Sequence, residues 1–293
     1  MTHKKYEFGR HETFSLREGW LSKGLDRIRS TNDLTGDVDT ADALGLGRNM
    51  IRSLVFWMEA TGLAERTSGG RILSDFAFRL ADKDPHFEFS ISTWFAHLHL
   101  ARRGGTAWSW FFNDFRGGGF DRATCVEAFH RHVRQHAANQ TTRSVLEREI
   151  ACLLATYAAK PPSEPANPED LTMSPFHTLG LLLEHHDTGR FEKAAPLDAV
   201  PVEAFLACVQ MVILDAETSS LPLSDLISRR NSPARLFNID GDTIDTLAHR
   251  SVEIYGNKGV QLALLGSTRT ITLPNVPPEE WYDLHFKRIG GLM

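Results

Sequence analysis

The segment Gly47-Arg48-Asn49, followed one turn later by Arg52, carries side chains that can read the edges of nucleic-acid bases. Arginine pairs with O6 and N7 of guanine, and asparagine pairs with N6 and N7 of adenine. A helix is predicted at Arg48–Ala60, and its first turns carry these side chains, as does the second helix of a helix-turn-helix. The pattern favours DNA contact, and its alternative is a helix that contacts protein and leaves solvated arginines.

A second group of polar residues lies just before another predicted helix. His11 and Glu12 could ligate a divalent metal ion or serve as acid and base. In the alternative, Thr13 or Ser15 caps the helix. An acidic side chain, Glu12 or Glu18, then stabilises the positive end of the helix dipole. Capping patterns are far commoner than catalytic ones, so the residues alone favour the structural interpretation.

The order of elements around these residues is typical of a winged helix-turn-helix. Apolar spacing and turn residues predict helices at Leu16–Ile28, Thr40–Leu44, Arg48–Ala60 and Asp75–Ala81, and a hairpin of Leu63–Thr67 with Arg71–Leu73. Asp39 and Ser74 are predicted N-caps, and Gly62 is the predicted C-cap of the arginine-bearing helix. Arg66 and Arg71 lie on the hairpin, from which they could reach phosphates.

The rest of the chain is predicted to be mostly helical, with a second, smaller α+β domain. Further elements are expected at Ser92–Arg102, Ala107–Phe115, Asp121–His136, Thr141–Tyr157, Val202–Leu214, Leu223–Ile227, Asp242–Tyr255, Val260–Leu265 and Arg269–Leu273. The last four repeat the order helix, helix, hairpin, which suggests a second winged-helix-like unit. Four prolines between Lys160 and Asp170 predict a linker. The expected domains are therefore residues 1–158 and 172–293, joined by 159–171.

Bulk composition is that of an ordinary globular protein, with 293 residues, 42% hydrophobic, 24% charged and a net charge of −5. Residues 1–158 hold 21 Lys and Arg against 19 Asp and Glu, whereas residues 159–293 hold 11 against 18. The first part is therefore the better partner for a polyanion. No apolar run could span a membrane, and the start of the sequence lacks a secretion signal. Three cysteines without paired spacing indicate buried, reduced thiols and a cytoplasmic location.

Other clusters are better explained by structure than by chemistry. The histidine groups at 97–99, 130–136 and 185–186 lack the further ligands of a zinc site. The carboxylates at 37–42 and 240–245 are best interpreted as helix N-caps, and the second lacks the spacing of a calcium loop. Trp108–Phe115 is interpreted as core rather than as a platform for stacking bases.

Taken together, the N-terminal motifs resemble the SspB-type proteins, a family of domains of unknown function found beside sulfur-transfer genes. The resemblance covers most of the chain and is strongest over residues 8–63. Its motifs are His11-Glu12-Thr13-Phe14, Leu16-Arg17, Gly19-Trp20-Leu21, Lys23-Gly24, Leu46–Ser53 and Trp57–Leu63.

The resemblance implies a role in single-stranded DNA phosphorothioation, an antiphage modification in which sulfur replaces a non-bridging phosphate oxygen. It implies a nicking step with Mg²⁺, and a cysteine desulfurase, an ATPase and an ATP-pyrophosphatase as partners. His11, Glu12 and Arg17 occupy the family's N-terminal motif, so they are the candidate catalytic residues. No metal ligands and no nuclease signature are recognised. The alternative function is a non-catalytic DNA-binding adaptor or transcriptional regulator with a winged helix.

Overall fold

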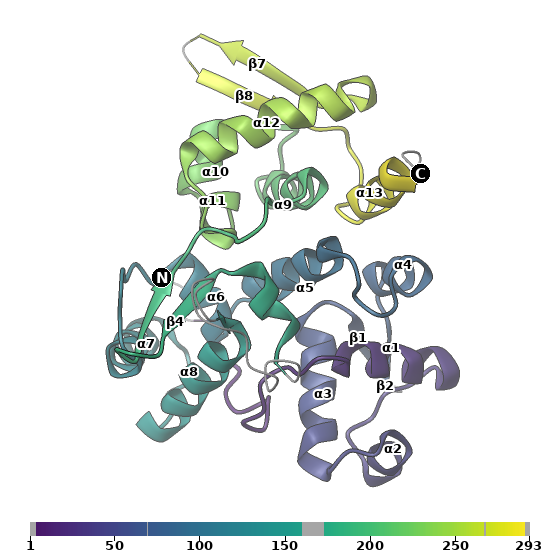
Figure 1. Cartoon of the computed structure of the whole chain (residues 1–293), viewed down its shortest axis with the longest axis vertical. Helices are drawn as coiled ribbons and strands as arrows, with labels where there is room; N and C mark the ends of the chain where they lie inside the picture. The colour runs from purple at the N-terminus through teal and green to yellow at the C-terminus, as the bar shows by residue number, and fades with distance from the viewer. Residues whose placement is uncertain (1–3, 69, 160–172, 267, 291–293) are drawn as a thin grey trace. The chain divides into compact units, whose positions relative to one another are not determined.

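The computed structural model describes residues 4–68, 70–159, 173–266 and 268–290, and the chain divides into two compact units, Met1–Leu197 and Asp198–Met293. Within these residues the protein is mainly helical with three small sheets (Figure 1). The predicted Pro-rich linker at Lys160–Asp170 lies outside the described residues. None of the described helices is long and apolar enough to cross a membrane.

The first unit begins with the predicted succession of helices and hairpin. Its elements are α1 (Trp20–Thr31), α2 (Val38–Leu44), α3 (Arg48–Ala60), β1 (Ala64–Thr67), β2 (Gly70–Leu73) and α4 (Asp75–Lys83). Helices α1 and α2 pack on α3, and β1 pairs with β2 in an antiparallel hairpin. Ser74 caps α4 by accepting a hydrogen bond from the backbone N–H of Ala77, as predicted. Gly62 follows α3 with a φ of 74°, which suits glycine because it has no Cβ.

Two predicted helix starts are wrong. Helix α1 begins at Trp20 rather than Leu16, because Gly19 adopts a left-handed conformation directly before it. Neither Thr13 nor Ser15 caps α1, whose N-cap is Gly19 without a side-chain hydrogen bond. Helix α2 begins at Val38, and its cap is Asp37 rather than Asp39, because the Asp37 carboxylate accepts a hydrogen bond from the Thr40 backbone N–H at 2.8 Å.

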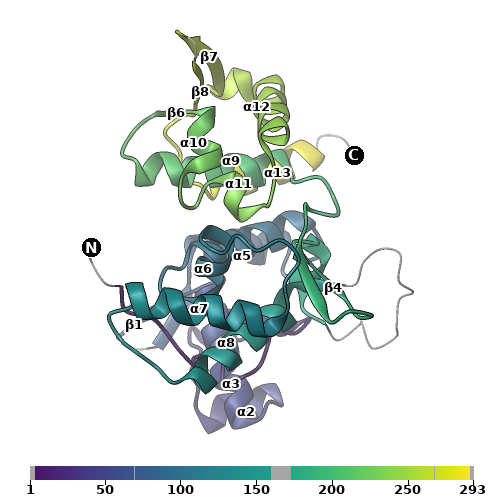
Figure 2. The same ribbon diagram turned by 90° about the vertical axis from the view of Figure 1, so that its left-hand side faces the viewer.

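The core of the first unit lies among four further helices. They are α5 (Ser90–Arg102), α6 (Ala107–Asn113), α7 (Arg122–His136) and α8 (Arg143–Tyr157). Helix α6 packs on α5 and α8, and α7 packs on α8 (Figure 2). The aromatic residues of Trp108–Phe115 are all buried, so their assignment to the core is confirmed. Cys125, Cys152 and Cys208 are free and buried, also as predicted.

A small sheet that the sequence did not reveal joins residues after α8 to this core. Its order is β3 (Ala158–Ala159), β4 (Leu182–His185) and β5 (Arg190–Lys193), with β3 parallel to β4. The Lys193 ammonium donates to the carbonyl oxygens of Phe111 at 2.5 Å and Phe115 at 3.0 Å. These contacts place residues 173–197 in the first unit, whereas the sequence-based division begins the second domain at residue 172.

The second unit combines helices with a three-stranded antiparallel sheet. Its elements are α9 (Val202–Asp215), β6 (Ser220–Pro222), α10 (Leu223–Ser228), α11 (Pro233–Leu236), α12 (Gly241–Tyr255), β7 (Gln261–Leu265), β8 (Thr268–Thr272) and α13 (Glu280–Gly290). The strand order is β6-β8-β7, and the β7–β8 hairpin projects from the helices (Figure 1). Asp240 caps α12 by accepting a hydrogen bond from the Thr243 backbone N–H, which confirms the N-cap interpretation of this carboxylate cluster.

A buried carboxylate ties the last helix to the second unit. Glu203 on α9 is fully buried and accepts hydrogen bonds from Tyr255 Oη at 2.5 Å and from Arg288 Nε at 2.7 Å. His285 Nδ1 lies 2.9 Å from its other oxygen. Burial raises the pKa of Glu203, but the hydrogen bonds from His285, Arg288 and Tyr255 outweigh it and lower the pKa to about 2. Glu203 is therefore ionised at neutral pH and fastens α13 to α9.

Candidate nucleic-acid interface

The start of α3 is open to solvent, as a helix that reads DNA requires. Arg48, Asn49 and Arg52 are all exposed, while Ile51, Leu54 and the following apolar residues are buried against the rest of the unit. Arg48 and Asn49 form no hydrogen bond or ion pair with other described residues. Three polar side chains are thus presented in the first turns of the helix.

The loop that carries His11 lies beside this helix and is held from inside. His11 is 1% exposed, and its Nδ1 accepts a hydrogen bond from the backbone N–H of Thr13 at 3.2 Å. The neutral ring therefore carries its proton on Nε2, which lies 3.2 Å from Glu149 Oε1 on α8 without hydrogen-bond alignment. The aligned donor to that oxygen is the backbone N–H of Gly9, at 2.6 Å. Since His11 is buried, it can position the loop but cannot touch a ligand in solvent.

A second anchor fixes the other end of the loop. The carbonyl oxygen of Phe14 accepts hydrogen bonds from Trp57 Nε1 at 3.2 Å, Cys152 Sγ at 3.4 Å and Ser53 Oγ at 3.5 Å. These donors come from α3 and α8, so the loop is clamped between the two helices. The clamp requires unusual backbone angles in the loop.

Glu12 and Thr13 are the residues with these unusual backbone angles, and their φ values are 49° and 69°. Positive φ is unfavourable for residues with a Cβ, and most of all for a β-branched residue such as threonine. Strained backbone of this kind persists only where the surroundings impose it, and it concentrates at functional sites. The outcome is that Glu12 and Arg17 point to the surface while His11 points inward.

Glu12 and Arg52 meet at a small pocket between the loop and α3. Glu12 Oε1 lies 3.9 Å from Arg52 Nη1, and both side chains are partly exposed. The pocket has a volume of about 270 Å³, and we call it the Arg52 pocket. Its lining residues are Gly9, Arg10, Glu12, Gly36, Arg52, Val55, Phe56 and Arg71. Three of these residues are arginines, and since Arg71 pairs with Glu59, Arg10 and Arg52 are the cations that favour an anionic ligand here.

A larger cleft of about 730 Å³ adjoins it, and we call it the Arg66 cleft. Its lining residues are Lys5, Tyr6, Glu7, Phe8, Arg10, Glu59, Ala64, Arg66, Arg103, Asn139, Gln140 and Thr141. Arg10 lines both cavities, so they lie on either side of, or next to, one side chain. The cleft brings together parts of the chain that are far apart in sequence, including the N-terminal segment, β1 and the turn after α7.

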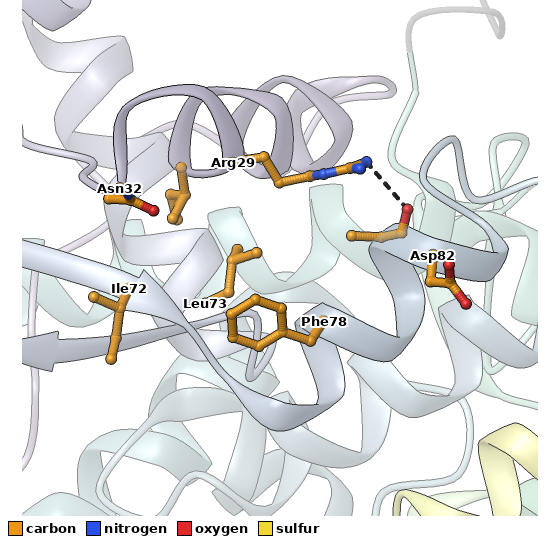
Figure 3. Close-up of a pocket in the computed structure, with 8 residues that line it drawn as sticks. Arg29, Asn32, Ile72, Leu73, Phe78 and Asp82 are labelled. Carbon is orange, nitrogen blue, oxygen red and sulfur yellow. Dashed lines mark hydrogen bonds between the residues drawn. The ribbon is translucent and has the colours of Figure 1, made fainter.

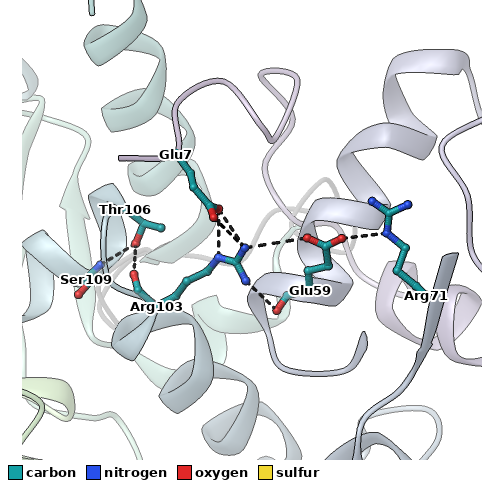
Figure 4. A network of polar contacts seen from close by, with 6 residues as sticks. All are labelled: Glu7, Glu59, Arg71, Arg103, Thr106 and Ser109. Atoms are coloured by element: carbon teal, nitrogen blue, oxygen red, sulfur yellow. Dashed lines mark hydrogen bonds and ion pairs between the residues drawn. The ribbon is translucent and has the colours of Figure 1, made fainter. Parts of the chain in front are cut away.

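A chain of ion pairs forms one wall of the cleft (Figure 4). The Arg103 guanidinium donates hydrogen bonds of 2.9 to 3.2 Å to the Glu7 carboxylate. Its Nη1 also donates to the Glu59 backbone carbonyl oxygen at 3.3 Å. Arg71 Nε donates to the Glu59 carboxylate at 2.8 Å, and both side chains are largely buried. Arg71 is therefore committed to Glu59, whereas Arg66, its cross-strand partner, is exposed and forms no such pair with described residues.

A third cavity, between α1, β2 and α4, differs in chemistry. It has a volume of about 550 Å³ and is lined mainly by apolar side chains, including the exposed Ile72 and Phe78 (Figure 3). Arg29 donates to the Ala81 carbonyl oxygen at 3.2 Å across its edge. This pocket offers little to an anion, so the arginine-lined cavities are the candidate site.

The family model described as a protein of unknown function, DUF4007, matches residues 8–263. The chain belongs to the DUF4007 family. The matched region includes the clamped loop, the start of α3 and the whole lining of the Arg52 pocket, and it begins after Lys5, Tyr6 and Glu7 of the Arg66 cleft. A comparison with curated proteins finds no match.

Two solved structures share the fold of this DUF4007 protein. A crystal structure of magnesium ion-bound SspB has a TM-score of 0.82 and 23% identity, covering 98% of this chain and 88% of that chain. A second SspB crystal structure has the same TM-score and coverage with 22% identity. The resemblance to SspB-type proteins that the motifs indicate is confirmed at the level of the fold.

The described part of this DUF4007 chain contains no group of three or more His, Cys, Asp or Glu side chains that could hold a metal ion. Glu12 is the carboxylate that lines the Arg52 pocket, and it faces an arginine. These residues do not form a preformed magnesium centre.

Sequence reasoning missed several residues of this site. Arg10 stands inside a recognised motif, yet only its place in both cavities distinguishes it from its neighbours. Glu149 lies on α8 and Arg103 directly follows α5, and the apolar patterns of these helices gave no sign of contact with the N-terminal segment. A charged residue that falls on the buried face of a helix, as Glu149 does, was the available signal.

Proposed function

We propose that this protein is the DNA-binding component of a DNA phosphorothioation system and that it docks on duplex DNA through the start of α3. The observation that carries the proposal is the exposure of Arg48, Asn49 and Arg52 beside two cavities lined with arginine. The fold shared with SspB supports the placement in the phosphorothioation system. A cysteine desulfurase, an ATPase and an ATP-pyrophosphatase are the protein partners that this placement implies.

The arrangement of elements supports two winged helices. In the first unit, α2 and α3 form the helix pair and β1–β2 forms the wing, so Arg48, Asn49 and Arg52 stand where a recognition helix carries its base contacts. In the second unit, α10, α12 and the sheet β6-β8-β7 follow the same plan. The start of α12 presents the exposed Asp242, which would repel phosphates, while Asp245 is paired with Arg269. We therefore assign DNA contact to the first unit.

The double variant Arg48→Ala with Arg52→Ala is expected to bind duplex DNA at least about tenfold more weakly, because a good arginine–base pair contributes about 1–3 kcal/mol. Where the arginines contact phosphates instead, the slope of log affinity against log salt concentration should fall by about 1.8. Fluorescence anisotropy with a labelled duplex over a series of salt concentrations measures both.

The matched control is Lys23→Ala with Arg148→Ala, which removes two exposed cations that line neither cavity. It should change affinity far less. If wild type and the Arg48/Arg52 variant have equal affinity and an equal salt slope, then α3 does not contact the duplex.

We further propose that the protein nicks DNA with Mg²⁺, with Glu12 and Arg17 at the surface of the clamped loop and His11 positioning them from inside. The Arg17 guanidinium lies 5.7 Å from the ring centres of Phe14 and Trp20, which hold it near the loop. Because the described residues form no preformed metal centre, no step is derived through the ion. Magnesium commonly binds through one or two carboxylates together with phosphates of the substrate.

Supercoiled plasmid incubated with pure protein is expected to become relaxed in Mg²⁺ and to stay supercoiled in EDTA. Glu12→Gln should reduce the rate of relaxation at least about a hundredfold, since a catalytic acid or base contributes about 10² to 10⁴. Glu18→Gln, an exposed acid nearby, is the control. If wild type binds DNA but never relaxes the plasmid, the protein is a non-catalytic adaptor or regulator instead.

A further inference from the structure

The Arg66 cleft holds positive charge that the protein leaves uncompensated. The side chains of Lys5, Arg10 and Arg66 are exposed and form no hydrogen bond or ion pair with other described residues. The two carboxylates of the cleft, Glu7 and Glu59, are already bound by arginines of the wall network (Figure 4). Three cations therefore face the cavity without a partner.

The cleft lies at the end of a path along α3. Arg48, Arg52 and Glu59 follow one another on this helix, with Arg52 at the Arg52 pocket and Glu59 at the Arg66 cleft. The helix rises about 1.5 Å per residue, so the path from Arg48 to Glu59 is about 16 Å long. Arg10 lines both cavities. A strand that leaves the duplex at the start of α3 and follows this path would pass Arg52, Arg10 and Arg66.

The cleft suits an unpaired strand better than a duplex. Its volume of about 730 Å³ is in the range of a small-ligand cavity. A duplex is bound by elements on the exposed surface of a protein and does not enter a cavity of this size. Phe8 lines the cleft, and its ring stacks on Tyr6 at a centroid distance of 5.6 Å. Proteins that hold single strands combine basic grooves of this kind with aromatic rings for the bases.

We propose that the Arg66 cleft binds an unpaired DNA strand, with Lys5, Arg10 and Arg66 at its phosphates and Phe8 beside a base. The proposal rests on the proposed function, because the duplex next to that strand is docked through α3. The Arg66 cleft is then a second nucleic-acid site, which binds a strand that is separated from its complement.

The test compares a blunt duplex with the same duplex carrying a single-stranded overhang, using labelled oligonucleotides and fluorescence anisotropy. Wild type is expected to bind the overhang substrate about tenfold more tightly than the blunt duplex. Lys5→Ala with Arg66→Ala should abolish this advantage, so that the variant binds the two substrates with equal affinity. Both side chains are exposed, so folding should be retained, and circular dichroism checks it. Lys23→Ala with Arg148→Ala, the same control as above, should keep the advantage.

The outcomes separate the two proposals. If wild type binds both substrates equally, or if the Lys5/Arg66 variant keeps the overhang advantage, the cleft is not a strand site, while DNA docking through α3 stands. If wild type binds neither substrate, the proposed function fails as well. A fall in the salt slope of about 1.4 for the Lys5/Arg66 variant on the overhang substrate, two cations at about 0.7 each, would support phosphate contact.

Discussion

Replacing Glu149 by alanine is expected to lower the free energy of unfolding of the first unit by about 2 to 5 kcal/mol. The backbone N–H of Gly9 loses its carboxylate partner, and the His11 ring loses the negative charge that faces Nε2. A cavity also replaces a side chain that is 1% exposed. Urea unfolding followed by circular dichroism measures the loss.

The same variant should lose DNA affinity although Glu149 touches no ligand. The loop of Glu12 and Arg10 stands at the Arg52 pocket only because Glu149 and the donors to Phe14 hold its strained backbone. Glu149→Gln retains a side-chain oxygen that can accept from the Gly9 backbone N–H. Its stability and DNA affinity should therefore lie between those of wild type and Glu149→Ala. Glu147→Ala, on the same helix but half exposed, should cost less than about 1 kcal/mol. Unchanged stability and affinity in Glu149→Ala would contradict the proposed role of the clamp.

In the second unit, Glu203→Ala is expected to cost about 3 to 5 kcal/mol, because it leaves the Arg288 charge without its buried partner and removes the acceptor that Tyr255 and His285 bond to. Hydrogen exchange should accelerate in α9 and α13, the helices that Glu203 joins. Glu253→Ala, an exposed acid on α12, is the control and should leave exchange nearly unchanged. Loss of protection confined to the first unit would contradict this assignment.

The same carboxylate should govern part of the acid sensitivity of the unit. The pKa of Glu203 in the folded state is about 2, below its usual value of 4.5, so its contribution is complete above about pH 4.5 and is lost as pH falls toward 2. The loss amounts to about 3 kcal/mol, since one pKa unit equals 1.36 kcal/mol. Urea unfolding at pH 7 and pH 3 should therefore show a smaller gap between wild type and Glu203→Gln at pH 3. A gap independent of pH would refute the assignment.

Elements with a strong local pattern could be predicted from sequence. The helix at Arg48–Ala60 and the β1–β2 hairpin follow from apolar spacing and turn residues, and the observed bounds agree closely. Caps at Ser74 and Asp240 follow from side chains that satisfy backbone N–H groups locally. The exposed arginines of α3 follow from the same periodicity.

Features that depend on distant contacts could not be predicted. Glu149 bonds to Gly9 across 140 residues, and Arg103 bonds to Glu7 across 96. A helical pattern tells which face of α8 is buried but not which segment covers it. The start of α1 at Trp20 rather than Leu16 could not be predicted for the same reason, because the hydrogen bonds to the Phe14 carbonyl oxygen hold the chain before Gly19 outside the helix.

The segment from Lys4 to Phe8 has a consequence for how the protein is prepared. The backbone of Lys4 forms hydrogen bonds with the backbone of His136 and Ala138, and the backbone of Tyr6 forms two with the Asn139 side chain. The Glu7 carboxylate accepts from Arg103. A shortened version lacking these residues would be missing one side of its own binding cavity.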